Sequence, residues 1–140
     1  MKKKILVSFV FLAMVLSANI FADVNFTLEI SGIAVNKGKI YVDLFSDENG
    51  YKKVIPYFSF VLESTSSNIT HRFNIAEGEY VIAVYQDTNN NGEMETNFIG
   101  MPKEPFALSN YKGGIPWSFN RLKYPVNNNS NRITLSMGKD

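Results

Sequence analysis

The fold of this chain is decided around residues 80–85, which read YVIAVY. Side chains point alternately to the two faces of a strand, so Tyr80, Ile82 and Val84 share one face. The residues between them are also apolar. A strand that is apolar on both faces is typical of the centre of a sheet that is covered on both sides. The stretch therefore predicts a buried central strand.

Segments in which apolar and polar residues alternate lie on both sides of this central stretch. Val24, Phe26 and Leu28, for example, alternate with polar residues, which predicts a strand with one buried face. The same pattern predicts strands at residues 24–30, 40–44, 57–63, 69–75, 122–126 and 133–137. With the central stretch, this makes about seven strands.

Turn signals connect these predicted strands. Residues 36–38 read Asn-Lys-Gly, and we expect them to join the first two strands in a hairpin. Pro125 cannot donate to a ladder, so the strand at 122–126 belongs at an edge. Residues 86–120 form one long connection that is rich in Asn, Gly and Pro, and no segment forms a convincing amphipathic helix. The pattern predicts an all-β fold, a single β-sandwich of immunoglobulin-like or prealbumin-like type.

The start of the chain has the pattern of a secretory signal peptide. Three lysines follow Met1, residues 5–16 are apolar apart from Ser8, and Ala22 precedes Asp23. A transmembrane anchor is the alternative, but it needs about 20 apolar residues, and this run is shorter. We expect cleavage after Ala22, a single domain at residues 23–140, and a periplasmic or secreted location with no membrane anchor after cleavage.

The composition excludes several classes of protein and site. The chain has no cysteine, which excludes a lipoprotein anchor, disulfides, zinc-thiolate sites and cysteine nucleophiles. Three of the 14 basic residues but none of the 13 acidic residues lie within residues 1–22, so the rest of the chain is slightly acidic. Without a Lys/Arg cluster we expect no nucleic acid and no membrane surface as partner, but an unknown envelope protein or a small ligand.

One part of the long connection has the spacing of a metal-binding loop. Residues 87–97 read DTNNNGEMETN, with oxygen-bearing side chains at alternate positions and Gly92 at the sixth. This spacing resembles the first half of an EF-hand calcium loop, in which glycine allows the sharp bend. The candidate Ca²⁺ ligands are Asp87, Asn89, Asn91, Glu93 and Glu95.

The loop departs from that pattern at its twelfth position. An EF-hand has a bidentate Glu there, whereas this chain has Phe98. At least one ligand must therefore come from elsewhere or from water, and we expect a weak site, with affinity in the range of roughly 0.1–1 mM. The alternative is a turn without a ligand, because Asn and Gly tolerate left-handed backbone geometry.

A second candidate surface follows in the same connection. Lys103 and Glu104 stand between two prolines and, with Trp117, form a candidate surface for a ligand or partner. The alternatives are that Glu104 caps backbone N–H groups and that the aromatic residues anchor the connection on the sandwich. His71 is the only histidine, and a single histidine on a strand is more often packed than catalytic. We expect no catalytic residues and no cofactor other than calcium.

The run from Glu79 through Asn110 resembles one protein family, and the resemblance extends over nearly the whole chain after residue 22. The matching positions are Gly78, Tyr80, Ala83, Asp87, Asn89, Asn91, Gly92, Asn97, Gly100, Pro102, Glu104, Pro105, Ser109, Asn110, and the later Pro116 to Phe119. This pattern is similar to that of the bacterial DUF2141 proteins, and the resemblance implies a small exported domain of unknown function. Two positions depart from the pattern: Glu95 replaces the usual Asp, and residues 107–108 replace the usual Gly-Phe.

Three functions are compatible with these observations. The first is an exported, non-enzymatic binding or interaction module with a weak calcium loop at 87–97. The second is a periplasmic hydrolase with acid–base groups drawn from Asp87, Glu93, Glu95 and Glu104. The third, by analogy of fold alone, is transport of a small hydrophobic ligand. An enzyme should place two of the carboxylates in a closed pocket, whereas a calcium module should bring the loop oxygens together.

Overall fold

The computed structural model describes residues 22–97, 101–114 and 117–138, which form eight strands and two short helices. These elements are β1 (Asp23–Ser31), β2 (Lys39–Phe45), α1 (Glu48–Lys53), β3 (Phe58–Glu63), β4 (Ile69–Ala76), β5 (Gly78–Asp87), β6 (Phe106–Leu108), α2 (Phe119–Leu122), β7 (Tyr124–Val126) and β8 (Arg132–Ser136). The all-β class expected from the alternation is confirmed. The predicted signal peptide, residues 1–22, lies almost wholly outside the described residues.

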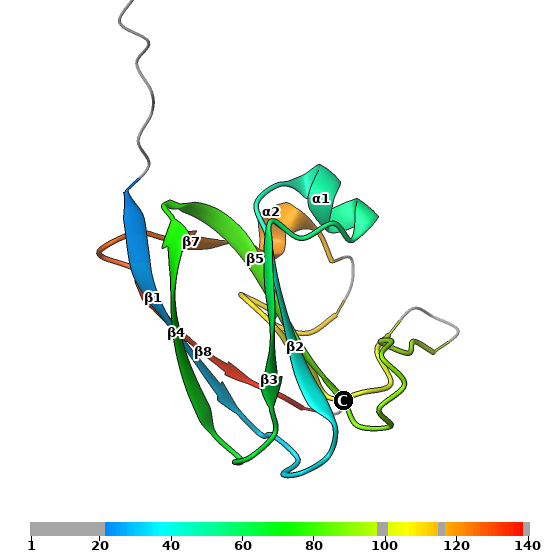
Figure 1. Ribbon diagram of the computed structural model, residues 1–140. Coiled ribbons are helices and arrows are strands. Elements are labelled where there is room, and N and C mark those ends of the chain that lie inside the picture. The colour runs from blue at the N-terminus through cyan, green and yellow to red at the C-terminus, as the bar shows by residue number, and fades with distance from the viewer. Residues whose placement is uncertain (1–21, 98–100, 115–116, 139–140) are drawn as a thin grey trace, which may run out of the picture.

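The strands form two sheets that face each other (Figure 1). One sheet has the order β4-β1-β8, in which β1 is antiparallel to β4 and parallel to β8. The other has the order β3-β2-β5-β6, and β7 pairs with the beginning of β5. The main core lies between the sheets and draws side chains from both, including the fully buried Phe26, Leu28, Ile40 and Ile82. The molecule is therefore a β-sandwich.

The predicted central strand is confirmed in β5. Its inward residues Ile82 and Val84 belong to the main core. Its outward residue Val81 is equally buried, because Phe45 and the α2 residues Phe119 and Leu122 pack with it in a second apolar cluster. Burial on both faces explains why this stretch of the sequence has no polar alternation.

The predicted hairpin between the first two strands is wrong. β1 and β2 lie in opposite sheets and face each other across the core instead of pairing. Residues 32–38 cross from one sheet to the other, and buried Ile33 keeps this crossing against the core. The turn signal was real, since Asn36 and Gly38 both have positive φ. Here the turn leads from a strand of one sheet to a strand of the other. The alternation of the flanking strands would look the same if the turn joined them in a hairpin.

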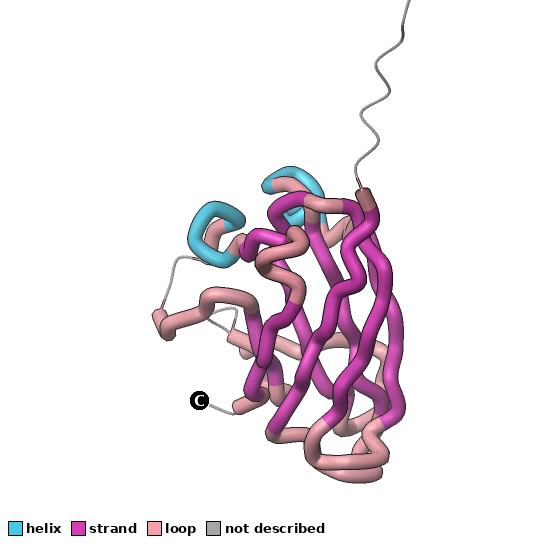
Figure 2. Tube along the Cα trace, turned by 90° about the vertical axis from the view of Figure 1, so that its left-hand side faces the viewer, coloured by secondary structure: helices cyan, strands magenta, loops and turns pink. Residues whose placement is uncertain are grey.

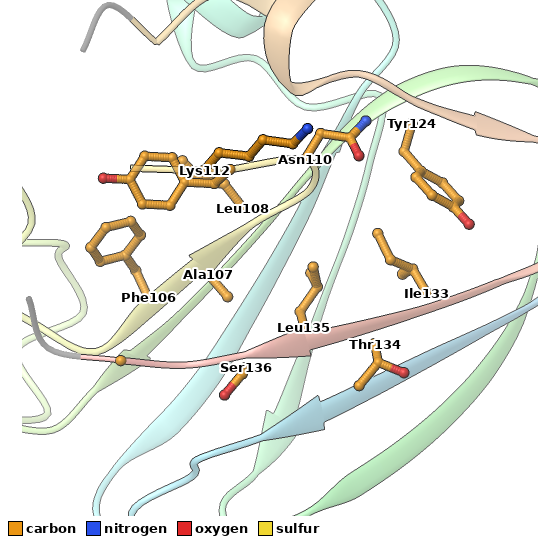
Figure 3. Close-up of a pocket in the computed structure, with 12 residues that line it drawn as sticks. Phe106, Ala107, Leu108, Asn110, Lys112, Tyr124, Ile133, Thr134, Leu135 and Ser136 are labelled. Atoms are coloured by element: carbon orange, nitrogen blue, oxygen red, sulfur yellow. The ribbon is translucent and has the colours of Figure 1, made fainter. Parts of the chain in front are cut away.

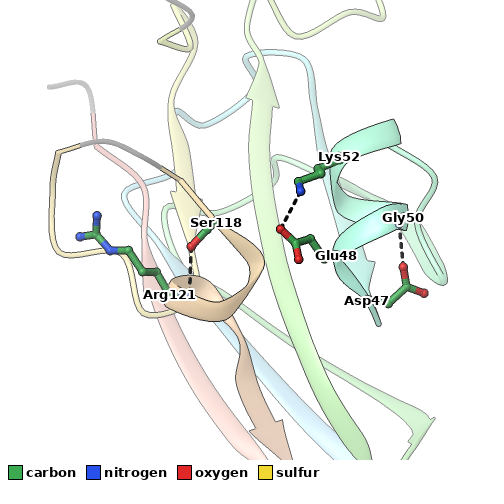
Figure 4. A network of polar contacts seen from close by, with 6 residues as sticks. All are labelled: Asp47, Glu48, Gly50, Lys52, Ser118 and Arg121. Atoms are coloured by element: carbon green, nitrogen blue, oxygen red, sulfur yellow. Dashed lines mark hydrogen bonds and ion pairs between the residues drawn. The ribbon is translucent and has the colours of Figure 1, made fainter.

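Both short helices were missed by the sequence analysis. α1 has six residues and α2 has four, which is too short for a 3.6-residue period to be visible. Each begins at a capping side chain, as Figure 4 shows: Asp47 accepts from the Gly50 N–H at 2.7 Å and Ser118 from the Arg121 N–H at 3.4 Å. Leu122, predicted in a strand, ends α2 instead.

The long connection at residues 86–120 contains one strand, β6, which its Asn-, Gly- and Pro-rich composition did not indicate. β6 has three residues and pairs antiparallel with β5, with Tyr85 opposite Phe106. Figure 2 shows loop segments projecting from the side of the sandwich below the helices. β6 thus divides the connection into a loop before it and an aromatic segment after it. The loop before it carries the candidate metal ligands.

Candidate functional site

The base of the candidate loop is an extension of the β5–β6 pair. The Gln86 N–H donates to the Pro105 carbonyl at 2.9 Å, one position beyond the last paired residues of β6. The same register places Glu104 opposite Asp87, the last residue of β5. Two residues that are far apart in the sequence therefore become cross-strand neighbours.

The outer part of the loop returns through a second, smaller ladder. The Lys103 N–H donates to the Glu95 carbonyl and the Asn97 N–H to the Met101 carbonyl, both at 2.8 Å. These bonds bring Glu95 back to the base of the loop, next to Glu104. Phe98 and Gly100, which the sequence analysis singled out, lie outside the described residues.

Asp87 organises the first half of the loop. Its carboxylate is 1% exposed. Oδ1 accepts from the Asn91 N–H at 3.1 Å and Oδ2 from the Gly92 N–H at 2.7 Å. Gly92 has a φ of 77°, a left-handed conformation that glycine adopts without steric cost. The bend expected at the sixth position is present, and the first candidate ligand lies at its centre.

The amide side chains of the loop face Glu95. Oε1 of Glu95 accepts from Nδ2 of Asn89 at 3.1 Å and from Nδ2 of Asn91 at 2.7 Å. The two amide oxygens bond to the loop backbone instead: Oδ1 of Asn89 accepts from the Asn91 N–H and Oδ1 of Asn91 from the Glu93 N–H. Half a turn about the last side-chain bond exchanges the oxygen and nitrogen of such an amide.

Four of the five candidate ligands thus meet in one hydrogen-bonded loop, namely Asp87, Asn89, Asn91 and Glu95. Glu93 contributes only its backbone N–H to this network and is exposed, so its side chain is left out of the ligand set proposed below. The oxygens do not yet converge on one point. Within the described residues no three acidic or histidine side chains form a ready-made metal cage. A cation here would need the asparagine amides to turn.

Glu104 is the most unusual residue of the site. It is 4% exposed, and neither of its carboxylate oxygens has a hydrogen-bond partner in the part of the chain that the structure describes. Burial raises the pKa of Glu104, and the neighbouring carboxylate of Asp87 raises it further. Two weak contacts, neither with full hydrogen-bond geometry, act in opposite directions: the one with the Asp87 side chain raises the pKa of Glu104, and the one with the Glu95 backbone lowers it. Glu104 was expected on a partner surface, and in the structure its side chain is buried.

The other two residues of that candidate surface differ from Glu104. Lys103 is exposed. Trp117 is half-buried, donates from Nε1 to the Gly114 carbonyl at 2.9 Å, and packs against the rings of Phe106 and Tyr111 at 5.5 and 5.6 Å. These contacts favour the interpretation that the aromatic residues anchor the connection. His71 packs in the same way, 4.6 Å from the ring of Phe60.

Two buried polar residues outside the predicted ligand set, Gln86 and Ser109, hold the site in place. Gln86 bonds to Ala34 and Lys37 of the crossing between the sheets, so it fixes the end of β5. Oγ of Ser109 accepts from the Ile82 N–H at 2.9 Å and donates to the Leu122 carbonyl at 2.6 Å, which attaches the end of β6 to β5 and α2. A polar residue at the end of an apolar strand was the available signal for Gln86.

An open groove of about 430 Å³ lies between β6 and β8 (Figure 3). Phe106, Tyr111, Tyr124, Ile133 and Ser136 are among its lining residues. Neither this groove nor a smaller hollow of about 390 Å³ beside Asn90 includes a carboxylate of the loop. Asp87 and Glu104 are therefore buried together outside the two cavities described.

Comparison with known protein families gives a match that covers most of the β-sandwich. The family model described as "Uncharacterized protein conserved in bacteria (DUF2141)" matches residues 28–134. No curated protein and no solved structure matches the chain. Among the described residues, no helix is long and apolar enough to cross a membrane. Because the match runs from β1 to β8 and includes the whole candidate site, the chain belongs to the DUF2141 family.

Proposed function

We propose that this protein is an exported, non-enzymatic binding module whose loop at residues 87–97 holds a calcium ion. One observation carries the proposal: Asp87 and Glu104 are buried beside Glu95, and none of the three forms an ion pair with a Lys or Arg in the described residues. Buried carboxylates require a proton, hydrogen-bond donors or a cation. Carboxylate and amide oxygens on a flexible loop suit Ca²⁺.

The role of the ion would be structural. The residues of the loop from 89 to 96 are exposed and contribute nothing to either apolar cluster. An ion held between Asp87 and Glu95 would give this loop one conformation. The ordered loop, with the exposed Lys103 next to it, would then be the surface that an envelope protein or small ligand contacts.

Calorimetric titration of the purified protein with CaCl₂ tests the metal. We expect saturable heat and a rise in melting temperature, both lost in Asp87→Ala. Asp47→Ala serves as the control, because Asp47 is an exposed helix cap outside the loop. No heat from the unaltered protein, and no thermal shift at several millimolar calcium, would refute calcium binding.

Export is tested separately, by cell fractionation and N-terminal sequencing. We expect the protein in the periplasm or medium with Asp23 as its first residue. An uncleaved chain in the cytoplasm would refute export.

Partner binding is tested by pull-down from envelope extract with calcium and with EDTA. We expect specific partners whose recovery falls in EDTA and in Lys103→Ala.

A hydrolase is the second candidate function. The buried pair of Asp87 and Glu104, in which burial and a like charge raise the pKa of Glu104, is an arrangement that acid–base enzymes use. Such an enzyme also needs a cavity that brings substrate to the pair, and neither cavity described includes it. Turnover of a model ester or glycoside that Glu104→Gln abolishes would favour the enzyme over the binding module.

A further inference from the structure

We propose that Glu104 is a calcium ligand, supplied from outside the loop in place of the glutamate that the twelfth position lacks. This inference rests on the proposed calcium-binding function and adds a residue that the loop pattern does not contain. In the sequence, position 12 is Phe98, so the loop by itself lacks one carboxylate of a complete site.

The Glu104 carboxylate is buried without a hydrogen-bond partner of full geometry in the described residues. Glu104 is 4% exposed, and both of its carboxylate oxygens are unpartnered within the described residues. Three other buried polar side chains in the described residues, those of Gln86, Ser64 and Ser109, hydrogen-bond to the backbone. Natural proteins leave few buried polar groups unpaired, and each exception calls for an explanation. A ligand that belongs at the site supplies the missing partner.

Glu104 is also placed to face the loop. Glu104 faces Asp87 across the extended β5–β6 pair, and its charge also acts on Glu95. The Lys103 N–H bond to the Glu95 carbonyl fixes the distance between the two sides of the loop. The carboxylate-bearing residues Asp87 and Glu104 therefore lie opposite each other, with Glu95 next to Glu104. Each oxygen of Asp87 keeps a lone pair beyond the N–H that it accepts.

A further argument is the chemistry of the donors. The site offers three carboxylates and two amides, and the chain has no cysteine and a single histidine, which packs elsewhere. Oxygen donors alone select a hard cation. Ca²⁺ accepts six to eight oxygens in flexible geometry, whereas Mg²⁺ requires near-ideal octahedral geometry and retains several waters. Ca²⁺ is the better match to a loop whose amides must turn to bind.

The decisive experiment compares Glu104→Gln with Glu93→Gln in the full chain. Both changes remove one negative charge near the same ion, but the Glu93 residue is exposed and only its backbone N–H bonds within the loop. We expect Glu93→Gln to change the dissociation constant for Ca²⁺ by less than about threefold. We expect Glu104→Gln to weaken it by roughly 10–100-fold, the range that changes around metal ligands produce. Calorimetric titration with CaCl₂ measures both.

The outcomes separate the two proposals. If the unaltered protein binds calcium and Glu104→Gln binds it as tightly, Glu104 is not a ligand and calcium binding stands. If both variants lose affinity equally, the effect is one of charge, and the ligand assignment is again wrong. If the unaltered protein does not bind calcium, the proposed function itself fails. Circular dichroism in EDTA checks that each variant is folded, and Glu104→Asp, with a shortened side chain, should bind with intermediate affinity.

Discussion

Gln86 and Glu104 are buried polar side chains at the same end of β5, and they are satisfied in opposite ways. Gln86 is fully buried and makes three hydrogen bonds, to the Ala34 N–H at 2.9 Å, the Ala34 carbonyl at 2.6 Å and the Lys37 carbonyl at 2.8 Å. Glu104 is almost as buried and makes none within the described residues.

Under the proposal made above, the difference separates a residue that holds the fold from one that binds an ion. The neutral amide of Gln86 finds all its partners in the chain, so removing it leaves backbone groups unpaired. The carboxylate of Glu104 has only weak contacts with the Glu95 backbone and the Asp87 side chain, so replacing it with a neutral amide loses little and relieves repulsion from Asp87. Substitutions at the two positions should therefore affect stability very differently.

The largest expected effect is that of Gln86→Leu. Leucine has a similar size but leaves the Ala34 N–H and the Lys37 carbonyl without their partners at a part-buried site, whereas the Ala34 carbonyl keeps the Lys37 N–H at 3.3 Å. We expect a loss of about 3 kcal/mol in the free energy of unfolding, the same with and without calcium. Urea denaturation measures it. A loss below about 1 kcal/mol would show that the crossing at residues 32–38 does not depend on Gln86.

Ser109→Ala should have the next largest effect. The hydroxyl bridges the Ile82 N–H and the Leu122 carbonyl in a fully buried position. Losing it leaves both groups unpaired, so we expect a loss of about 2 kcal/mol in urea denaturation. The matched control is Ser59→Ala on the exposed face of β3, which should change stability by less than about 0.5 kcal/mol. Equal effects would contradict this role for Ser109.

The Tyr80 hydroxyl, unlike the Glu104 carboxylate, has a hydrogen-bond partner, and its contribution to stability should depend on pH. The hydroxyl donates to the Ala76 carbonyl at 2.8 Å, and burial, followed by Tyr57 and Asp23, raises the pKa of Tyr80 above its ordinary value of 10.0. The folded protein therefore favours the neutral phenol more than the unfolded chain does. Its contribution to stability is full below pH 10 and is lost as pH rises through the folded-state pKa.

Tyr80→Phe isolates that contribution. We expect it to lower stability by about 1 kcal/mol at neutral pH, because one hydrogen bond is lost. We also expect it to reduce the fall in stability between neutral pH and alkaline pH above 10, measured as the midpoint of urea denaturation. An unchanged alkaline slope would show that another tyrosine is responsible.

The smallest effect on stability should be that of Glu104→Gln in EDTA. Removing an unpartnered charge beside Asp87 should leave the free energy of unfolding within about 0.5 kcal/mol of the original value, or raise it. The loss of stability expected for Gln86→Leu is thus far larger than that expected for Glu104→Gln, and urea denaturation measures both. A large loss would mean that Glu104 supports the fold as Gln86 does.

The successes and failures of the sequence analysis have local physical causes. The run of apolar residues at 80–85 found β5, and alternation found six of the eight strands. It missed β6, which has three residues and is a strand only because β5 lies beside it. It placed β1 and β2 in a hairpin, because the pattern shows which face of a strand is buried but not which strand is its neighbour.

The candidate site divides in the same way. The local spacing predicted the Asp87 loop, and its bend at Gly92 and its Asp87–backbone bonds are present. The burial of Glu104 was not predictable from its neighbours, since two flanking prolines and an adjacent lysine suggest a surface segment. It follows from the register between β5 and the returning strand.

The sequence by itself determined the all-β class, the central strand at residues 80–85 and the loop that begins at Asp87, because each depends on residues within about ten positions of one another. Only the tertiary structure decided that β1 and β2 face each other across a core, and that Glu104 lies opposite Asp87. The physical reason is that pairing between distant segments is set by the packing of whole faces and by hydrogen-bond register, neither of which a local pattern contains.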